Sequence, residues 1–469
     1  MIKNILLVKP ISEFREIITP NLGLGYIASS CRKNGYDVNI LDCVKDDYDY
    51  RKFEEHIKNN SIDLIGFQLY SSDINNVRKS ADIVKSVNPR IKIVIGGPHP
   101  TSLPKQSLHL SEHFDFGIIG EAEYNFVKLI DYLNGVSNNS INDIPGLIYR
   151  KDSEILWNNR AYINNLDDIE MPAWDLINPN SYPLLPHGDF VKAVPVAPIM
   201  TSRGCPFECT FCAGPLMFSR KIRYRSIEKV IDEIIYLNKN YGVKEIHIED
   251  DNFTLNKKYV IDFCNLLNKN RLKIHWALPN GIRLNTVDEE LLEAIKEAGC
   301  YSIAVGIESG SQRILDSIKK KLTVPLIKEK VKLIYNYGLR ITGFFIIGFP
   351  GETIEDINKT ISFSLELPLT KAWFGLFQPL PGTEAYFKLE SDKKISNINW
   401  DNLLTTKGIY SPDGISIEQL KHFQKKAILK FYMRLPIILK LIFEIRHYLQ
   451  IRQIILRMVG IYRKSMIEK

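Results

Sequence analysis

The sequence of 469 residues lacks any window of 18 uncharged apolar residues, so we expect no membrane-spanning helix. A signal peptide is not expected either, because the first apolar run, residues 5–8, is too short for one and suits a strand. Solenoid-type repeats and low-complexity segments are also missing. These absences leave a globular protein, and its length predicts two or three domains.

Cysteine is sparse, with seven residues in the chain. Four of them are scattered: Cys31, Cys43, Cys264 and Cys300. An odd and scattered set is not a disulfide framework. The other three, Cys205, Cys209 and Cys212, span only eight residues and lie inside the segment RGCPFECTFCAG. Clustered thiols beside isolated ones indicate a metal site in a reducing compartment, so we expect a cytoplasmic protein.

Positive charge is concentrated at the C-terminal end. From Lys421 onward there are 12 Lys and Arg against 2 Asp and Glu, whereas the rest of the chain has 49 against 52. Apolar residues recur there at helical spacing, so we expect a helical basic region over residues 389–469. It could be a helical cap on the folded body, a surface that contacts anionic membranes, or a site for an acidic partner. Nucleic acid is not expected, because no binding module is recognisable and the body is slightly acidic.

The first 135 residues alternate short apolar runs with helical patterns. We expect strands at residues 4–8, 38–41, 64–67, 91–95 and 116–119, with helices between them. This alternation predicts an α/β domain with a doubly wound parallel sheet of flavodoxin or Rossmann type. Ligands of such sheets bind at the carboxyl ends of the strands. A connector with many prolines and a small hairpin at 147–149 and 155–157 then fills residues 136–197.

A second series of strands and helices occupies residues 198–388. We expect strands at residues 199–201, 245–248, 274–277, 302–305, 341–347 and 372–377. Helical patterns at 227–240, 257–268, 288–298, 324–337 and 354–365 separate them. Six such units are fewer than the eight of a closed barrel, so the pattern predicts an open, partial (βα)6 barrel. The three clustered cysteines follow its first strand, at the mouth where barrel active sites lie.

The cysteine spacing limits the kind of metal site. A structural zinc site usually has two C-x-x-C pairs, whereas this segment has one pair and Cys205 four residues earlier. Inert buried thiols are the other plain explanation. Three thiolates on one loop suit a [4Fe–4S] cluster, and they leave one iron open to a small bidentate ligand. Gly204 and Pro206 suit the tight turns of such a loop.

The motif C-x-x-x-C-x-x-C after the first strand of a partial barrel resembles the radical S-adenosylmethionine (radical SAM) superfamily. The likeness covers about residues 198–384 and includes the aromatic Phe211 before the third cysteine. It implies that SAM chelates the open iron and that its reductive cleavage gives a 5′-deoxyadenosyl radical. It also implies a reductase, a flavodoxin or a ferredoxin as electron donor.

The resemblance also implies SAM contacts after the later strands. Asp250 and Asp251 follow the second strand, where carboxylates would pair with the SAM amino group. Arg283 follows the third, where a guanidinium suits the SAM carboxylate. Helix capping at 252–254 and a plain surface position for Arg283 are the alternatives.

Two further segments complete the SAM site that the resemblance implies. Glu308 and Ser309 end the fourth strand, where ribose and methionine groups bind. Ile346 ends the fifth, in GFFIIGFPGE, a segment that suits packing against adenine; ordinary core packing is its alternative.

A flavodoxin-like domain ahead of the barrel resembles the cobalamin-binding branch of this superfamily. The stretches that carry the likeness are TPNLGLGY at 19–26, GFQLYS at 66–71, GGPHP at 96–100, GEAE at 120–123 and PLPGTE at 379–384. They imply that cobalamin is bound by residues at the ends of the third and fourth strands: Gln68, Leu69, Tyr70, Ser71, Gly96 and Gly97.

One motif departs from many cobalamin domains. D-x-H-x-x-G, whose histidine ligates cobalt, is absent after the first strand, where the chain reads KPISEFREII. His99 is the nearby imidazole, and loop hydrogen bonding or cobalt ligation could explain it. A degenerate domain that binds no corrin is the alternative.

The resemblance predicts a cobalamin-dependent C-methyltransferase that uses SAM both as radical source and as methyl source. Cyclisation, dehydration or another radical rearrangement on the same scaffold is the first alternative, and a non-catalytic iron–sulfur electron carrier is the second. Methylthiolation is disfavoured, because only Cys31 and Cys43 lie in the N-terminal part to hold a second cluster. The substrate class stays open among small molecules, lipids and peptides.

Overall fold

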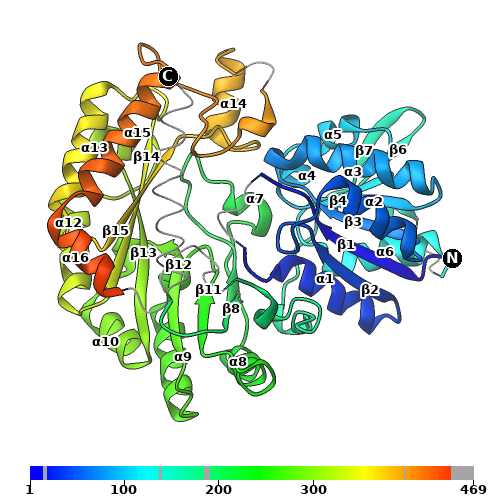
Figure 1. Ribbon diagram of the computed structural model, residues 1–469, viewed down its shortest axis with the longest axis horizontal. Helices are drawn as coiled ribbons and strands as arrows, with labels where there is room; N and C mark the ends of the chain where they lie inside the picture. The colour runs from blue at the N-terminus through cyan, green and yellow to red at the C-terminus, as the bar shows by residue number, and fades with distance from the viewer. Residues whose placement is uncertain (14–17, 137–139, 184–190, 396–397, 445–469) are drawn as a thin grey trace.

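The computed structural model describes residues 1–13, 18–136, 140–183, 191–395 and 398–444. Two β-sheets built mainly of parallel strands, each flanked by helices, lie side by side along the long axis of the molecule (Figure 1). The N-terminal sheet fills one half and the barrel fills the other, with the short helix α7 (Gly214–Phe218) between them. The predicted α/β fold class is therefore confirmed.

The N-terminal sheet has the strand order β2-β1-β3-β4-β5-β6-β7. Its parallel strands are β1 (Asn4–Lys9), β2 (Asp37–Asp42), β3 (Leu64–Gln68), β4 (Lys92–Gly96) and β5 (Phe116–Ile118). The helices that cover it are α1 (Leu22–Lys33), α2 (Tyr50–Asn59), α3 (Ile74–Val87) and α6 (Glu123–Leu133). Because β1 lies between β2 and β3, the direction of winding reverses at the β1–β3 pair, where doubly wound sheets bind ligands.

The hairpin that we expected in the connector belongs to the N-terminal sheet. β6 (Leu147–Lys151) pairs antiparallel with β5, and β7 (Glu154–Trp157) pairs with β6. The two strands pack closely because Gly117 has no side chain; a Cβ there would lie 2.9 Å from the Cδ1 atom of Ile148. Leu147 and Ile148 on β6 are both buried.

The barrel is a six-stranded parallel sheet in the order β8-β11-β12-β13-β14-β15. Its strands are β8 (Val196–Ile199), β11 (Glu245–Ile248), β12 (His275–Ile282), β13 (Cys300–Glu308), β14 (Arg340–Ile347) and β15 (Lys371–Leu376). The outer helices are α8 (Ile227–Tyr241), α9 (Lys257–Lys269), α10 (Glu289–Glu297), α12 (Val324–Asn336) and α13 (Ile354–Glu366). Among the described residues, no pairing joins β15 to β8, so the sheet is open there as predicted.

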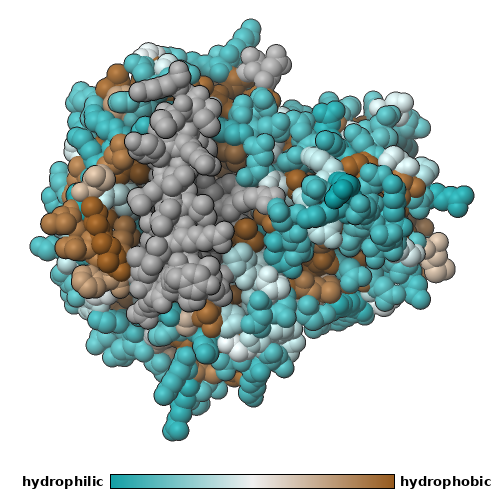
Figure 2. Space-filling view, in the orientation of Figure 1, coloured by the Kyte–Doolittle hydropathy of each residue, from teal (hydrophilic) through white to brown (hydrophobic). Residues whose placement is uncertain are grey.

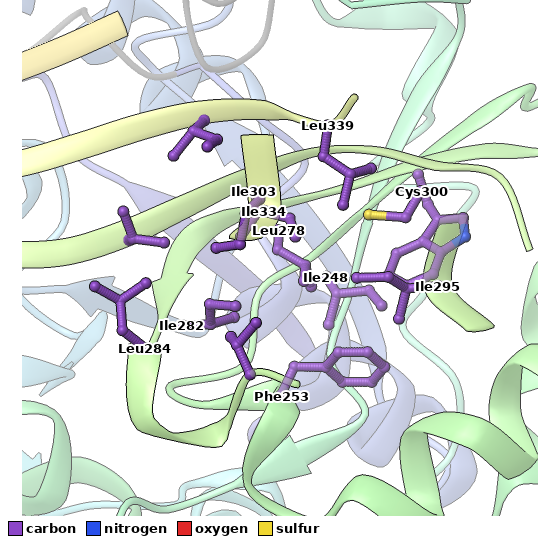
Figure 3. Packing of buried hydrophobic residues seen from close by; sticks show 14 of the residues in the cluster. Ile248, Phe253, Leu278, Ile282, Leu284, Ile295, Cys300, Ile303, Ile334 and Leu339 are labelled. Carbon is purple, nitrogen blue, oxygen red and sulfur yellow. The ribbon is translucent and has the colours of Figure 1, made fainter. Parts of the chain in front are cut away.

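The barrel core lies between the sheet and its outer helices (Figure 3). Phe253, Phe263 and Trp276 meet edge to face, with ring centroids 5.7–6.0 Å apart. Such contacts are favourable because the positive ring edge meets the negative ring face. Cys300 is buried in the same cluster, so this isolated thiol is core and not a ligand.

The described residues after the barrel form three α-helices: α14 (Glu384–Ser391), α15 (Ile417–Tyr432) and α16 (Leu435–Glu444). α15 packs beside the last strand, where the Tyr432 hydroxyl donates to Ala372 O at 2.9 Å and Gln424 Nε2 donates to Phe374 O at 2.7 Å. No described helix has the length and apolarity that crossing a bilayer requires. The rest of the basic region, residues 445–469, lies outside the described residues.

Candidate active site

The cysteine loop begins where β9 (Ser202–Arg203) ends and leads into α7. Gly204 makes this turn with φ +104°, and a Cβ there would lie 2.5 Å from Lys221 O, so only glycine fits. Cys205 and Cys209 are half-buried and Cys212 is exposed, whereas the other four cysteines are buried. Accessible thiols on one glycine-turned loop suit a bound cluster, and inert core packing does not explain them.

Arg283 lies against the cysteine loop and is buried, so the plain surface position is wrong. Its guanidinium carbon lies 3.6 Å from the centroid of the Phe207 ring, and one of its NH groups lies 3.6 Å from Cys209 Sγ. Another NH group donates to the Lys320 carbonyl oxygen. A cation held at this loop would offset part of the negative charge that three thiolate ligands bring to a cluster.

The two aspartates after β11 differ in their surroundings. Asp250 is buried and accepts hydrogen bonds from Thr201 N at 2.7 Å, Thr201 Oγ1 at 2.5 Å and Ser202 Oγ at 2.6 Å. Its carboxylate therefore fixes the chain just before the cysteine loop. Asp251 makes no hydrogen bond within the described residues, and a Cβ on Gly214 would lie 3.2 Å from its Oδ1 atom. Loss of hydration beside the surrounding protein raises the pKa of Asp251, and repulsion from the Asp250 carboxylate adds to this effect. The residue nevertheless reaches solvent. Asp251 is thus the carboxylate available to a ligand at the loop.

Glu308 ends β13 with φ +64°, a conformation that is uncommon for a residue with a side chain. Its Oε1 atom accepts from Lys320 Nζ at 2.7 Å, and both side chains are buried. The pair lies directly over Gly306, where a Cβ would be 2.6 Å from Oε1 and 2.8 Å from Nζ. Lys320 was missed from the sequence, since it sits in a run of three lysines that resembles an exposed surface.

Ser309 lies next to Glu308 but is fully buried on the α13 side. Its hydroxyl lies 3.0 Å from Thr360 Oγ1 and accepts from Ser311 N at 3.1 Å. These bonds fix the loop after β13, and the side chain faces a neighbouring helix. Its assignment to SAM stays a prediction with no support from this contact pattern.

Phe211 and Ile346 come together although 135 positions separate them in the sequence. Both pack against one apolar cluster between the cysteine loop and the end of β14. The Phe211 ring meets Phe349 edge to face, with centroids 5.4 Å apart. Ile346 is half-buried, which leaves part of its side chain for a ligand. The cysteine loop and the end of β14 therefore share one apolar wall.

Glu352 is a second residue that the sequence motifs did not single out. One oxygen of its carboxyl group accepts from Gly348 N at 2.5 Å and from Phe349 N at 3.0 Å. The other oxygen is buried with no partner among the described residues. Burial raises the pKa of Glu352 to about 8. The side chain holds the turn that places Phe349 against Phe211.

The carboxyl edge of the N-terminal sheet is organised mainly by backbone groups. Leu69 N donates to Gly96 O at 2.7 Å, and His99 N donates to Leu69 O at 3.1 Å. Gln68 Oε1 accepts from Asn21 Nδ2 at 2.7 Å. A Cβ on Gly96 would meet nothing within 4 Å, so the space beside this strand end is open. Open backbone of this kind fits the close approach of a large ring.

Gly97, Tyr70 and Ser71 belong to the same edge of the sheet. Gly97 has φ +102°, which requires glycine. The Tyr70 side chain is 45% exposed and free to cover a ligand. Ser71 Oγ lies 2.9 Å from Nδ1 of His99.

His99 is buried, and its ring meets Trp400 edge to face with centroids 5.6 Å apart. Burial lowers its pKa to about 4, so the imidazole is neutral at neutral pH. The contact with Ser71 supports the loop-bonding explanation for this histidine.

A buried ion network joins the two edges. Arg203, just before the cysteine loop, donates to Glu121 Oε1 at 2.9 Å and to Glu123 Oε1 at 2.6 Å. Arg223 donates to Glu121 Oε2 at 2.8 Å. All four side chains are buried, and α7 lies between the two halves (Figure 1). The carboxyl edge of the N-terminal sheet therefore faces the cysteine loop.

The described residues contain no group of three or more His, Cys, Asp or Glu side chains arranged around a single metal ion. A [4Fe–4S] cluster makes a different demand, because each thiolate binds its own iron atom. The accessible cysteines, the glycine turn and the neighbouring Arg283 fit that demand.

Comparisons with known proteins place each half of the chain. Residues 199–364 match the radical SAM superfamily, and residues 13–130 match the B12 binding domain. An uncharacterized methyltransferase of Pyrococcus horikoshii is 34% identical over 447 residues, which cover 95% of each chain. The cytidylyl-2-hydroxyethylphosphonate methyltransferase of Streptomyces wedmorensis is 30% identical over 77% of this chain and 76% of its own.

A solved structure shares the fold of both halves. It is the radical S-adenosylmethionine methyltransferase TsrM from Kitasatospora setae with cobalamin and a [4Fe–4S] cluster bound. The TM-score is 0.68 at 18% identity, over 90% of this chain and 81% of that chain.

Proposed function

Because this chain belongs to the radical SAM superfamily and carries a B12-binding domain, we propose that it transfers a methyl group to an unactivated carbon. It is an enzyme, and its cofactors are a [4Fe–4S] cluster, SAM and cobalamin, as the motifs indicated. The observation that carries the proposal is the buried network of Arg203, Arg223, Glu121 and Glu123, which turns the N-terminal edge toward the cysteine loop. A substrate between these two edges could reach both cofactors.

The barrel residues have distinct parts in this proposal. Cys205, Cys209 and Cys212 would hold the cluster, and Asp251 would accept from the SAM amino group. When bound, the cluster supplies the electron that cleaves SAM to a 5′-deoxyadenosyl radical, and cobalamin supplies the methyl group. Arg283 stabilises negative charge at the loop, since it is held beside Cys209 Sγ.

The N-terminal edge would bind cobalamin through shape. Open space beside Gly96 and the backbone turn at Gly97 admit a large ring, and Tyr70 is free to cover it. Neutral His99 adds no charge there. The apolar wall of Phe211, Phe349 and Ile346 would exclude water from the reacting carbon.

An anaerobic turnover experiment with methyl-deuterated SAM tests the function. We expect two products from SAM: 5′-deoxyadenosine from radical formation and S-adenosylhomocysteine from methyl donation to cobalamin. Mass analysis of candidate small molecules, lipids and peptides should then find one that gains the labelled methyl group. An external reductant, or a flavodoxin or ferredoxin with its reductase, provides the electrons.

The products separate the alternatives. 5′-Deoxyadenosine without S-adenosylhomocysteine, in protein loaded with cobalamin, would indicate a radical rearrangement in place of methyl transfer. Unchanged SAM and an unchanged cluster spectrum would indicate an electron carrier and exclude the proposed function.

A further inference from the structure

An apolar surface lies on the outside of the barrel, away from both cofactor edges. Its side chains follow the last turns of α15 and one face of α16: Leu429, Met433, Leu435, Leu439, Ile442 and Phe443. We call this set the α15–α16 apolar face. Figure 2 shows it as a brown area over α16. Phe443 is 83% exposed and Ile442 is 55% exposed, which is unusual for such large apolar side chains.

The face is not needed to hold α16 in place, because the opposite side of the helix does this. Ile437 is buried in the barrel core. Glu444 pairs with Arg340 at 3.0 Å, and Lys440 Nζ lies 5.1 Å from the centroid of the Tyr335 ring. Anchored on one side, the helix presents its other side as a surface for something else.

Charge around the face indicates what it contacts. Between Lys421 and Glu444 the chain has six Lys and Arg, of which Lys440 lies on the anchored side of α16. Glu444 is the one acidic residue of this segment and is already paired with Arg340. Lys425 and Lys430 are exposed beside the apolar side chains. Residues 445–469 add six more Lys and Arg against one Glu in composition. Cations around an apolar helix face match a bilayer surface, where anionic headgroups lie outside the acyl chains.

We infer that the α15–α16 apolar face binds the surface of an anionic lipid bilayer. The apolar side chains enter the boundary between headgroups and acyl chains, and the lysines contact lipid phosphates. The enzyme lies on the surface, since none of the described helices can cross a bilayer. This binding does not depend on methyl transfer, so either can fail without the other.

Vesicle sedimentation with the full-length protein tests the inference. We expect binding to vesicles of phosphatidylcholine mixed with phosphatidylglycerol, weaker binding as salt rises, and little binding to phosphatidylcholine alone. Replacing both Ile442→Glu and Phe443→Glu should weaken binding at least about tenfold, because two apolar contacts are lost and two like charges meet the surface. Both residues are exposed, so the fold should survive.

Phe387→Glu is the matched control. Phe387 is also apolar and 49% exposed, but it lies on α14. The Phe387→Glu substitution should leave vesicle binding unchanged. Absent binding to anionic vesicles, or binding that the double variant retains, would overturn the inference. Dimerisation of the wild type that the double variant abolishes, without vesicle binding, would instead assign the face to a second copy.

Discussion

The barrel mouth and the N-terminal edge are built from different kinds of groups. At the barrel mouth, buried charged side chains have fixed partners: Lys320 pairs with Glu308, and Arg283 lies beside the Cys209 thiol. At the N-terminal edge, Gly96, Gly97 and backbone hydrogen bonds do most of the work. SAM is small and carries separate charges, whereas cobalamin is a large ring. We therefore expect placed charges to select SAM and open backbone to select cobalamin.

Removing the cluster ligands should abolish cofactor binding at the barrel mouth and leave it intact at the N-terminal edge. Cys205→Ala, Cys209→Ala or Cys212→Ala should abolish iron binding and 5′-deoxyadenosine formation, because a four-iron cluster that leaves one iron to SAM needs a thiolate on each of the other three. Cobalamin binding should persist, since none of the three lies in the N-terminal sheet. Iron content and retained cobalamin absorbance after gel filtration measure both effects.

Cys264→Ala is the control, because this buried thiol packs in the barrel core. Iron content should stay as in the wild type. Cluster assembly in any of the three loop variants would contradict the assignment.

Gly96→Val should have the opposite pattern, with cobalamin binding weakened and the cluster retained. The added side chain meets no protein atom within 4 Å of its Cβ, and valine suits the end of a strand, so the fold should remain. The side chain would fill the space that we assign to cobalamin and weaken its binding at least about tenfold, the effect of about 1.4 kcal/mol. Iron content should not change. Unaltered cobalamin affinity, measured by titration, would place the ring elsewhere.

The sequence predicted most of the fold because its periodicity reports buried faces. All five parallel strands of the first sheet and all six of the barrel overlap the apolar runs that indicated them, and their ends differ from the prediction by at most five residues. The hairpin was assigned to the connector, since nothing local reveals that Ile148 pairs with Gly117. Pairing across such a distance depends on the assembled sheet.

The site was predicted unevenly for the same reason. The cysteine loop was recognised because the spacing of its three cysteines lies within one short segment. Lys320 and Glu352 were not, because their importance comes from burial, which depends on the assembled fold. Lys320 also meets Glu308 only in the fold, whereas Glu352 bonds Gly348, four residues earlier in the chain. Arg203 and Glu121 were likewise hidden, as 82 positions separate them.

Lys320→Met tests whether placed charge governs the barrel mouth. Removal of the cation leaves Glu308 buried without its partner, so we expect a loss of about 3 kcal/mol in unfolding free energy. We also expect roughly tenfold weaker SAM binding, because Glu308 loses its fixed position. Thermal unfolding and SAM titration measure the two effects, and Lys320→Arg should restore much of both.

Lys321→Met is the neighbouring control. Its side chain is 65% exposed and lies 3.7 Å from Glu208, so its loss should have little effect. SAM affinity in Lys320→Met equal to that of the wild type would reduce the pair with Glu308 to a structural role.

Glu352 gives a smaller, pH-dependent effect in the same half of the molecule. Its folded-state pKa of about 8 lies above that of an unfolded glutamate. The unfolded chain therefore loses this proton first as pH rises, and stability falls between roughly pH 4.5 and pH 8. Glu352→Gln cannot titrate, so its unfolding free energy should rise relative to the wild type across that window, by about 1.4 kcal/mol for each pH unit. Urea unfolding of the full-length protein at a series of pH values measures the difference, with exposed Glu355→Gln as control. A difference that stays level across the window would show that the buried oxygen of Glu352 is charged, and that the turn at Gly348 and Phe349 is held by a carboxylate.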